Sequence, residues 1–415
     1  MSILRPFKGI RQAPELAKKV AALPYDVMTS DEAREEVKDN PYSFLHVDRG
    51  EIDLPRGTDE HADEVYAKAA ENLNNMIEKG VFIQDKTPVL YIYRLTMEGR
   101  TQTGITGCAS IDEYRQNKIK KHEHTLYEKE LDRIRHVDTC NANTGPIFLT
   151  YMDRKKINET VETLIREHSP VYDFVSDDKI GHTVWVIDDR ETIDVLVSEF
   201  AEVNAMYIAD GHHRNASAVR VGLMRRAAKP DYTGEEEFNF YLAVAFPKSQ
   251  LKIYDYNRVV KGLNGYTEKD FLNKVSEVFK IEEYKGEGSL RPERPFTFGM
   301  YLNKKWYLLS AEHIDTSDPV KSLDVSILQN HLLGPILGIH DPRTDKRIDF
   351  VGGIRGLGEL ERRVNSGEMT VAFSMYPTSI KQLMNIADNG RIMPPKSTWF
   401  EPKLRSGLFI HKLED

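Results

Sequence analysis

The stretch AMYIADGHHR, residues 205–214, joins an apolar run to a polar turn and predicts a junction between a strand and a helix. Residues 205–209 are apolar and short, which indicates a buried strand. Residues 215–228 have a helical pattern, so the polar residues 210–214 lie at the start of a helix. A helix start presents unpaired backbone N–H groups and a positive dipole end, and both favour an anionic ligand.

The side chains of this turn favour phosphate as that ligand. Gly211 lets the backbone approach a ligand closely. Arg214 offers a planar fork for phosphate oxygens, and His212 and His213 can donate as well. Asp210 could hold a metal ion, orient a histidine or cap the helix. The alternative is a capped turn with solvated histidines, but two histidines and an arginine behind one glycine favour a binding site.

A second polar motif, KKHEHT, occupies residues 120–125. A carboxylate beside basic side chains is typical of phosphoryl transfer, because the carboxylate accepts the proton of the substrate hydroxyl and the cations offset phosphate charge. Glu123 is then the candidate base, and Lys121 and His122 are candidate phosphate contacts. Thr125 is a candidate substrate or lid residue. The alternative is the solvated polar start of a helix.

The histidines of the two motifs also allow a metal site. Together the motifs hold four histidines, one glutamate and one aspartate, which is a donor set for a divalent metal. A metal-dependent phosphohydrolase therefore competes with a kinase. The motif is not HExxH, because a histidine follows Glu123 directly. The neighbouring lysines and Arg214 suit phosphate better than metal.

Three further segments have weaker signals. Prolines fix the backbone of residues 393–403 (MPPKSTWFEPK), which would present Lys396, Ser397 and Thr398 rigidly, either over a ligand or in a docked tail. The segment LPYDV contributes two more candidate substrate or lid residues, Tyr25 and Asp26. Further along the chain, residues 43–47 resemble a strand. The glycine cluster at residues 352–358 matches no nucleotide-loop motif and predicts a tight turn into a helix.

Composition excludes several classes of protein. The chain has 415 residues, with 57 Lys and Arg against 65 Asp and Glu, so its net charge is −8. That charge argues against a broad nucleic-acid surface. No apolar run approaches the roughly 18 to 20 residues that span a membrane, and the N-terminus lacks the apolar core of a secretory signal. Two cysteines exclude a disulfide framework. We expect a cytoplasmic protein with small-molecule partners, and a homodimer is a candidate assembly.

Strands and helices alternate along the chain, which predicts an α+β or mixed α/β fold. The expected regions are 1–110, an α/β region packed on the core; 111–262, the catalytic core; and 263–415, an α/β region whose tail closes on the site. Helices are expected at residues 59–79, 155–167, 191–203, 215–228, 268–279, 322–333, 355–366 and 379–387. Strands are expected at residues 88–97, 101–111, 182–187, 205–209, 239–246 and 370–375, with a hairpin at 296–309.

The motifs resemble those of two known groups. The strand, the Gly-x-x-Arg turn at residues 211–214 and the helix are similar to the phosphate-binding turn of the ParB/sulfiredoxin fold. LPYDV, HEHT, ADGHHR and MPPKSTWFEPKLRSGLF resemble, over nearly the whole chain, a widespread family of bacterial and archaeal proteins without an assigned function. The His-Glu and DGHHR elements also resemble those of SerK-type free serine kinases, which phosphorylate L-serine with ATP or ADP and Mg²⁺.

The resemblance implies a ParB/sulfiredoxin-like core with large N- and C-terminal additions. It implies that Glu123 is the catalytic glutamate, that residues 211–214 bind the nucleotide phosphates, and that Asp210 lies beside Mg²⁺. The function it implies is a nucleotide-dependent kinase making O-phospho-L-serine from free L-serine, or the reverse with ADP. A metal-dependent phosphohydrolase and a nucleotide-binding regulator without transfer are the alternatives. The length of the chain, well beyond that of the compact kinases, leaves the acceptor open.

Overall fold

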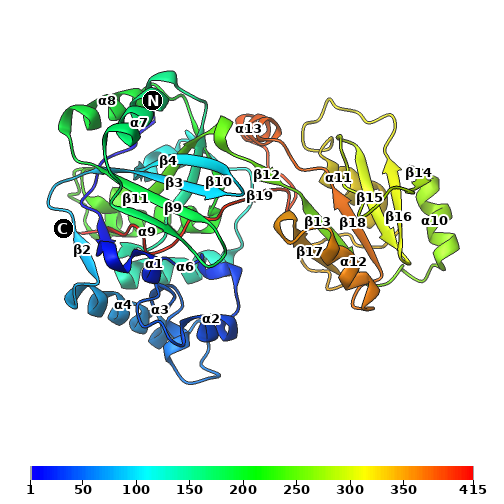
Figure 1. Cartoon of the computed structure of the whole chain (residues 1–415), viewed down its shortest axis with the longest axis horizontal. Coiled ribbons are helices and arrows are strands. Elements are labelled where there is room, and N and C mark those ends of the chain that lie inside the picture. Colours follow the sequence, from blue (N-terminus) through cyan, green and yellow to red (C-terminus); the bar gives the residue numbers. More distant parts are fainter. Residues whose placement is uncertain (1, 415) are drawn as a thin grey trace. The chain divides into compact units, whose positions relative to one another are not determined.

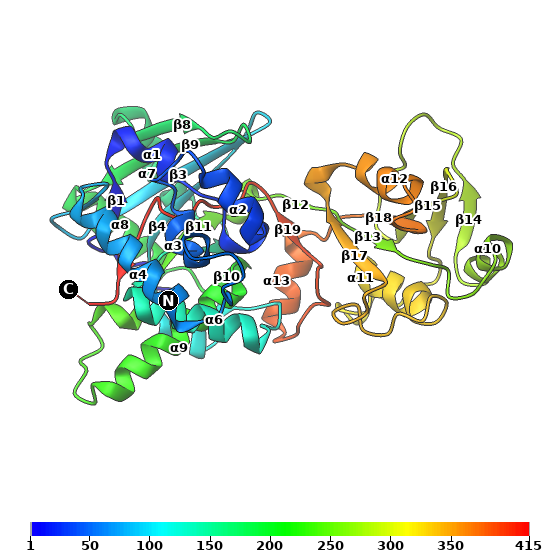
Figure 2. The same ribbon diagram turned by 90° about the horizontal axis from the view of Figure 1, so that it is seen from below.

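The computed structural model describes residues 2–414 and divides the chain into two compact units (Figures 1 and 2). Unit 1 comprises residues 2–121, 125–251 and 402–414. Unit 2 comprises residues 122–124 and 252–401. This division differs from the three expected regions, because the first 110 residues and the core share one sheet and the last residues return to unit 1.

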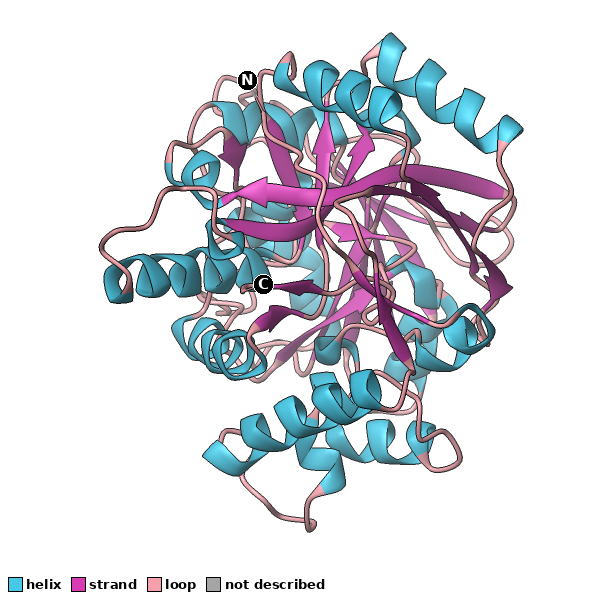
Figure 3. Cartoon of the chain, turned by 90° about the vertical axis from the view of Figure 1, so that its left-hand side faces the viewer, coloured by secondary structure: helices cyan, strands magenta, loops and turns pink. Residues whose placement is uncertain are grey.

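Unit 1 is built on an eight-stranded mixed sheet, whose strands cross the middle of Figure 3 with helices flanking them. Most neighbours are antiparallel, but β10 runs parallel to β5 and β11 runs parallel to β7. In order across the sheet the strands are β5 (Ile119–Lys120), β10 (Met206–Asp210), β7 (Ile147–Tyr151), β11 (Phe240–Pro247), β4 (Arg100–Ser110), β3 (Leu90–Met97), β9 (Gly181–Ile187) and β8 (Tyr172–Val175).

The central strands of this sheet are apolar and fully buried. Every residue of β7 and β11 is buried, as expected of strands covered on both faces. The larger helices of unit 1 are α4 (Asp63–Glu78), α6 (Tyr127–Cys140), α7 (Lys155–Glu167), α8 (Arg190–Ala201) and α9 (His212–Ala228). Helix α6 packs against both α4 and α9, so it links the N-terminal residues to the predicted phosphate turn.

Short elements complete unit 1, and most of them contribute to a second apolar core with α4. The helices are α1 (Ala17–Val20), α2 (Ser30–Val37), α3 (Leu45–Asp48) and α5 (Ile111–Arg115). The strands are β1 (Ile10–Gln12) with β2 (Phe82–Gln84), and β6 (Ala142–Asn143) with β20 (His411–Lys412). The last pair ties the C-terminal segment to the residue after α6.

Unit 2 is an antiparallel six-stranded sheet with helices. In order the strands are β14 (Lys280–Glu283), β16 (Lys305–Ser310), β15 (Thr297–Leu302), β18 (Val371–Met375), β13 (Tyr256–Val260) and β17 (Ile348–Gly352). The helices are α10 (Glu268–Ser276), α11 (Asp324–Leu328), α12 (Gly358–Asn365) and α13 (Ile380–Asp388), and β12 (Ile253–Tyr254) pairs with β19 (Trp399–Phe400). None of the helices in residues 2–414 is both long enough and apolar enough to cross a membrane.

The mixed α/β class and nearly all the expected elements are confirmed. Helix α7 has the expected bounds, and the glycine cluster is a turn followed by α12. The prediction for residues 43–47 is wrong, because this segment enters helix α3. The helix expected at 322–333 changes at Gln329 to a π-helix that ends at Leu333. The expected helix at 215–228 begins three residues earlier, at His212, which places the histidines in its first turn.

Candidate functional site

The predicted phosphate turn forms where β10 ends at Asp210 and α9 begins at His212. Gly211 is the residue between them and adopts a left-handed conformation with φ of 88°. A Cβ at this position would lie 3.2 Å from both Nε and Nη2 of Arg214. Glycine is therefore required twice, for the backbone angle and for the space that the guanidinium occupies. The N–H groups of the first turn of α9 follow directly.

The carboxylate of Asp210 is held by two donors in unit 1. Its Oδ1 accepts a hydrogen bond of 2.9 Å from the N–H of Gly211, and its Oδ2 lies 2.9 Å from Nζ of Lys403. Burial raises the pKa of Asp210, but the charges of Lys403 and Arg214 together with these hydrogen bonds outweigh it and leave the pKa well below its ordinary value. Asp210 is therefore ionised at neutral pH.

Lys403 is a site residue that the sequence analysis did not select. It is the last residue of the segment 393–403, whose candidate residues are Lys396, Ser397 and Thr398. Its ion pair with Asp210 spans 193 positions of the chain, and only 14% of its side chain is exposed. No local pattern marks such a contact, since it depends on the return of residues 402–414 to unit 1.

Arg214 and His213 connect the turn to neighbouring elements. Nη1 of Arg214 donates to the carbonyl of Pro146 at 2.9 Å, and Gly145 leaves room for this guanidinium. Nε2 of His213 accepts a hydrogen bond of 3.0 Å from the N–H of Leu126, the residue before α6. His212 is buried. The turn thus has cationic groups around it and a fixed backbone.

The KKHEHT motif begins at the edge of the sheet of unit 1. Strand β5 runs parallel to β10 and pairs Lys120 with Tyr207. Nζ of Lys121 lies 5.4 Å from the centre of the Tyr114 ring, which is a cation–π distance. Thr125 donates from Oγ1 to Glu130 at 2.9 Å, so its hydroxyl contacts a side chain of α6. Both ends of the motif therefore belong to unit 1.

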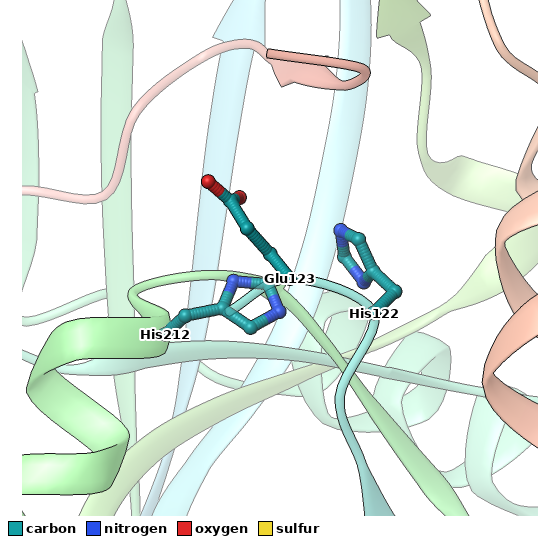
Figure 4. Close-up of side chains that lie close together, drawn as sticks. All are labelled: His122, Glu123 and His212. Carbon is teal, nitrogen blue, oxygen red and sulfur yellow. The ribbon is translucent and has the colours of Figure 1, made fainter. Parts of the chain in front are cut away.

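The middle of the motif, His122–His124, is grouped with unit 2. There the carbonyl of His122 accepts a hydrogen bond of 2.8 Å from the N–H of Met393. Nε2 of the His122 ring lies 3.4 Å from Oγ1 of Thr398. Figure 4 draws His122 and Glu123 on this loop and His212 at the start of α9. Covalent connection keeps the Cα of Glu123 within about 7.6 Å of those of Lys121 and Thr125, which are two residues away.

The proline-rich segment holds its three candidate residues in unit 2. Lys396 has a positive φ of 58°, and its carbonyl accepts from Nη2 of Arg258 at 3.0 Å. Ser397 is buried, and its hydroxyl donates to the carbonyl of Pro394 at 2.6 Å. The hydroxyl of Ser397 is thus used within the proline-rich segment itself. Thr398 is the member that contacts a residue of the KKHEHT motif, namely His122.

Of the two LPYDV candidates, Tyr25 is partly buried in unit 1 and Asp26 is exposed. The segment Tyr25–Val27 is a 3₁₀ turn rather than an extended segment. The guanidinium of Arg133, on α6, stacks 3.9 Å from the centre of the Tyr25 ring. Burial raises the pKa of Tyr25 to about 12, so its hydroxyl stays protonated and can donate. Tyr25 and Arg214 line the same small cavity.

Several solved structures share a distant likeness with the chain. Free serine kinase in complex with AMP is 12% identical, with a TM-score of 0.37 over 73% of this chain and 91% of that one. A C-terminally truncated SbnI from Staphylococcus aureus is 12% identical, with a TM-score of 0.40 over 72% and 85%. A conserved hypothetical protein from Pyrococcus furiosus is 14% identical, with a TM-score of 0.36 over 75% and 95%.

The search of curated proteins found no match for the chain. One family model does match, over residues 4–326, and it carries the description "Protein of unknown function (DUF1015)". The matched residues include three of the quoted motifs, LPYDV, HEHT and ADGHHR. The match covers well over half of the 415 residues, and the chain therefore belongs to the DUF1015 family.

Proposed function

We propose that this protein is a cytoplasmic, nucleotide-dependent kinase that transfers a phosphoryl group to the hydroxyl of a small metabolite. Free L-serine, giving O-phospho-L-serine, is the favoured acceptor, and the reverse reaction with ADP is the same chemistry run backwards. The observation that carries the proposal is the turn at residues 210–214, in which a helix start, Arg214 and Lys403 surround one glycine.

The turn has the parts that phosphate binding needs. Backbone N–H groups of the first turn of α9 point out of the helix start, where the dipole favours negative charge. Arg214 lies against Gly211, so its guanidinium is beside the open backbone. Lys403 adds a second cation, fixed by its ion pair with Asp210. Phosphoryl transfer depends mainly on positioning and on offsetting charge, and these groups supply both.

Glu123 is the proposed general base. Chain connectivity keeps its Cα within about 11 Å of that of Leu126, whose N–H donates to His213 of the turn. In the proposed step the acceptor oxygen attacks the terminal phosphorus of the nucleotide and forms the new P–O bond. The P–O bond to the bridging oxygen breaks and ADP leaves (AMP if ADP is the donor). The hydroxyl proton passes to the Glu123 carboxylate.

We propose that Asp210 is not a standing ligand for Mg²⁺. One of its oxygens accepts from Gly211 and the other from Lys403, so an ammonium already occupies the position that a cation would take. Mg²⁺ usually keeps several waters and binds through substrate phosphates. We therefore assign Mg²⁺ to the nucleotide, with which it enters as part of the substrate.

The test is a turnover assay with the full chain. The protein is incubated with Mg²⁺, with ATP or ADP, and with a pool of hydroxyl-bearing metabolites, and mass spectrometry identifies the phosphorylated product. We expect phosphoserine. Product from another hydroxyl compound would keep the kinase and replace serine, whereas nucleotide binding without any product would indicate a regulator. Stoichiometric Zn, Mn or Fe together with phosphatase activity would instead favour the phosphohydrolase.

A further inference from the structure

A small cavity lies inside unit 1, next to the phosphate turn. Its volume is about 20 Å³, which is room for one or two oxygen-sized atoms. Arg214 belongs both to the turn and to the cavity wall, so the cavity adjoins the proposed site of transfer. The polar members of the wall come from six separate segments and are Tyr25, Asp48, Arg133, His136, Asn143, Thr144, Arg214 and Ser406.

Arg133 is the central cation of this wall. It is 8% exposed, and its Nε donates to Oδ2 of Asp132 at 2.7 Å. Tyr66 donates to the other oxygen of Asp132 at 2.8 Å, so this carboxylate is fixed in place. Among the residues that the structure describes, no carbonyl or side chain accepts from the two terminal Nη groups of Arg133. A buried guanidinium with its terminal donors open to a cavity is a site for an oxyanion.

The other groups of the wall fit the same ligand. Thr144 donates to Oδ1 of Asp48 at 3.1 Å, so the acidic member of the wall already accepts a hydrogen bond. The wall therefore has two guanidiniums, those of Arg133 and Arg214, and one carboxylate, so its net charge is positive. The ring of Tyr25 covers Arg133 and leaves a protonated phenol at the edge. A planar fork pairs best with a planar carboxylate.

We infer that this cavity binds the carboxylate of the phosphoryl acceptor, through the terminal Nη groups of Arg133. The inference rests on the proposed kinase function and deepens it, because it limits the acceptor to a hydroxyl compound that also carries a carboxylate. The small volume has room for the two carboxylate oxygens only, so the hydroxyl-bearing end of the acceptor would lie outside the cavity. Arg214 belongs to both the cavity wall and the phosphate turn and so links the two. Neutral alcohols and amino alcohols are excluded as good acceptors.

The test compares two probes that differ only in a carboxylate, O-phospho-L-serine and O-phosphoethanolamine. Binding of each to the full chain is measured by calorimetry. We expect the wild type to bind O-phospho-L-serine at least about tenfold more tightly, as expected for a charge-assisted pair. Arg133→Met should remove this preference, and Arg133→Lys should restore part of it. Arg135→Met is the matched control, because it removes an arginine from the same helix at a partly exposed position paired with Asp63.

Three results overturn the inference, and all are distinct from failure of the kinase proposal. One is a wild type that binds the two probes equally. Another is an Arg133→Met variant that loses affinity for both probes by the same factor, or for neither. In that case its ADP affinity and thermal stability equal those of Arg135→Met. A product without a carboxylate in the metabolite assay would overturn it too. Failure of the kinase proposal would appear separately, as absence of ADP binding or of transfer. If Arg133→Met does not fold, Tyr25→Phe and Arg133→Lys provide the same comparison of probes.

Discussion

Nζ of Lys403 lies 2.9 Å from Oδ2 of Asp210, so the last segment of the chain neutralises the carboxylate that begins the phosphate turn. The pair joins residues that are 193 positions apart. It also fixes a cation beside the helix start of α9, where phosphate oxygens would bind. The first prediction follows from this pair.

Replacing Lys403 with methionine should destabilise the fold and weaken nucleotide binding. Removing one partner of a largely buried pair leaves the other uncompensated, which costs about 1–3 kcal/mol of unfolding free energy. Urea unfolding at pH 7 measures this loss. Lys18→Met is the control, because its pair with Asp177 is exposed and should contribute less than about 1 kcal/mol. Equal losses in the two variants would contradict the assigned role of Lys403.

The stability lost in Lys403→Met should depend on pH. The folded state lowers the pKa of Asp210, so the ionised carboxylate stabilises the fold above the ordinary aspartate pKa of about 3.9. This contribution is lost as the pH falls toward the lower folded value. The difference in unfolding free energy between wild type and Lys403→Met should therefore be constant above about pH 4 and shrink below it. A difference that grows on acidification would show that the pair does not depress the Asp210 pKa.

Gly211→Ala should harm both stability and phosphate binding. The alanine would have to adopt a positive φ, and its Cβ would displace the guanidinium of Arg214. We expect a loss of roughly 1–3 kcal/mol in unfolding free energy and weaker binding of ADP. Gly57→Ala is a matched control, because Gly57 has φ of 91° but open space around its Cβ position. Control and variant should share the backbone strain, while only Gly211→Ala should lose ADP affinity.

Arg214→Ala should lower the affinity for ADP and for inorganic pyrophosphate by at least about tenfold, because a charge-assisted donor to phosphate is removed. Calorimetry with each ligand measures the effect. Arg220→Ala provides the comparison, since Arg220 is an exposed residue of the same helix. Unchanged binding in Arg214→Ala would mean that the turn does not hold the phosphates.

Glu123→Gln should abolish transfer and leave ADP affinity largely intact, because the amide cannot accept the hydroxyl proton. General-base catalysis supplies about 10²- to 10⁴-fold of rate, and a loss of that size is expected. Glu128→Gln, at an exposed position five residues on, should keep the activity of the wild type. A Glu123→Gln variant that turns over normally would exclude Glu123 as the base.

Local sequence patterns predicted most of the helices and strands. Helix α6 was not predicted, because polar residues lie on its buried face. The strand and helix around residues 205–228 were predictable because each has its own periodicity and Gly211 separates them. Helix α6 was missed because its buried face carries Arg133 and His136 beside Val137 and Cys140. These polar residues hide the apolar repeat, and one of them is the central cation of the proposed carboxylate site.

The division of the chain into two units could not be predicted from the order of its helices and strands. Residues 402–414 return to unit 1 through pairings with distant segments, such as His411 with Asn143. Such pairings depend on tertiary structure, which local sequence patterns do not show. Lys403 escaped selection for the same reason, whereas the residues of the DGHHR turn are neighbours in sequence and could be found together.

The return of the C-terminal segment has a consequence for the newly made protein. Lys403 pairs with Asp210, and Ser406 lines the cavity beside Arg214, so both the turn and the cavity need residues that are synthesised after unit 2. All of residues 252–401 are synthesised before these two residues exist. A growing chain that has not yet reached Lys403 therefore carries the DGHHR turn without this counter-charge, and the site is complete only after residues 252–401 have been made.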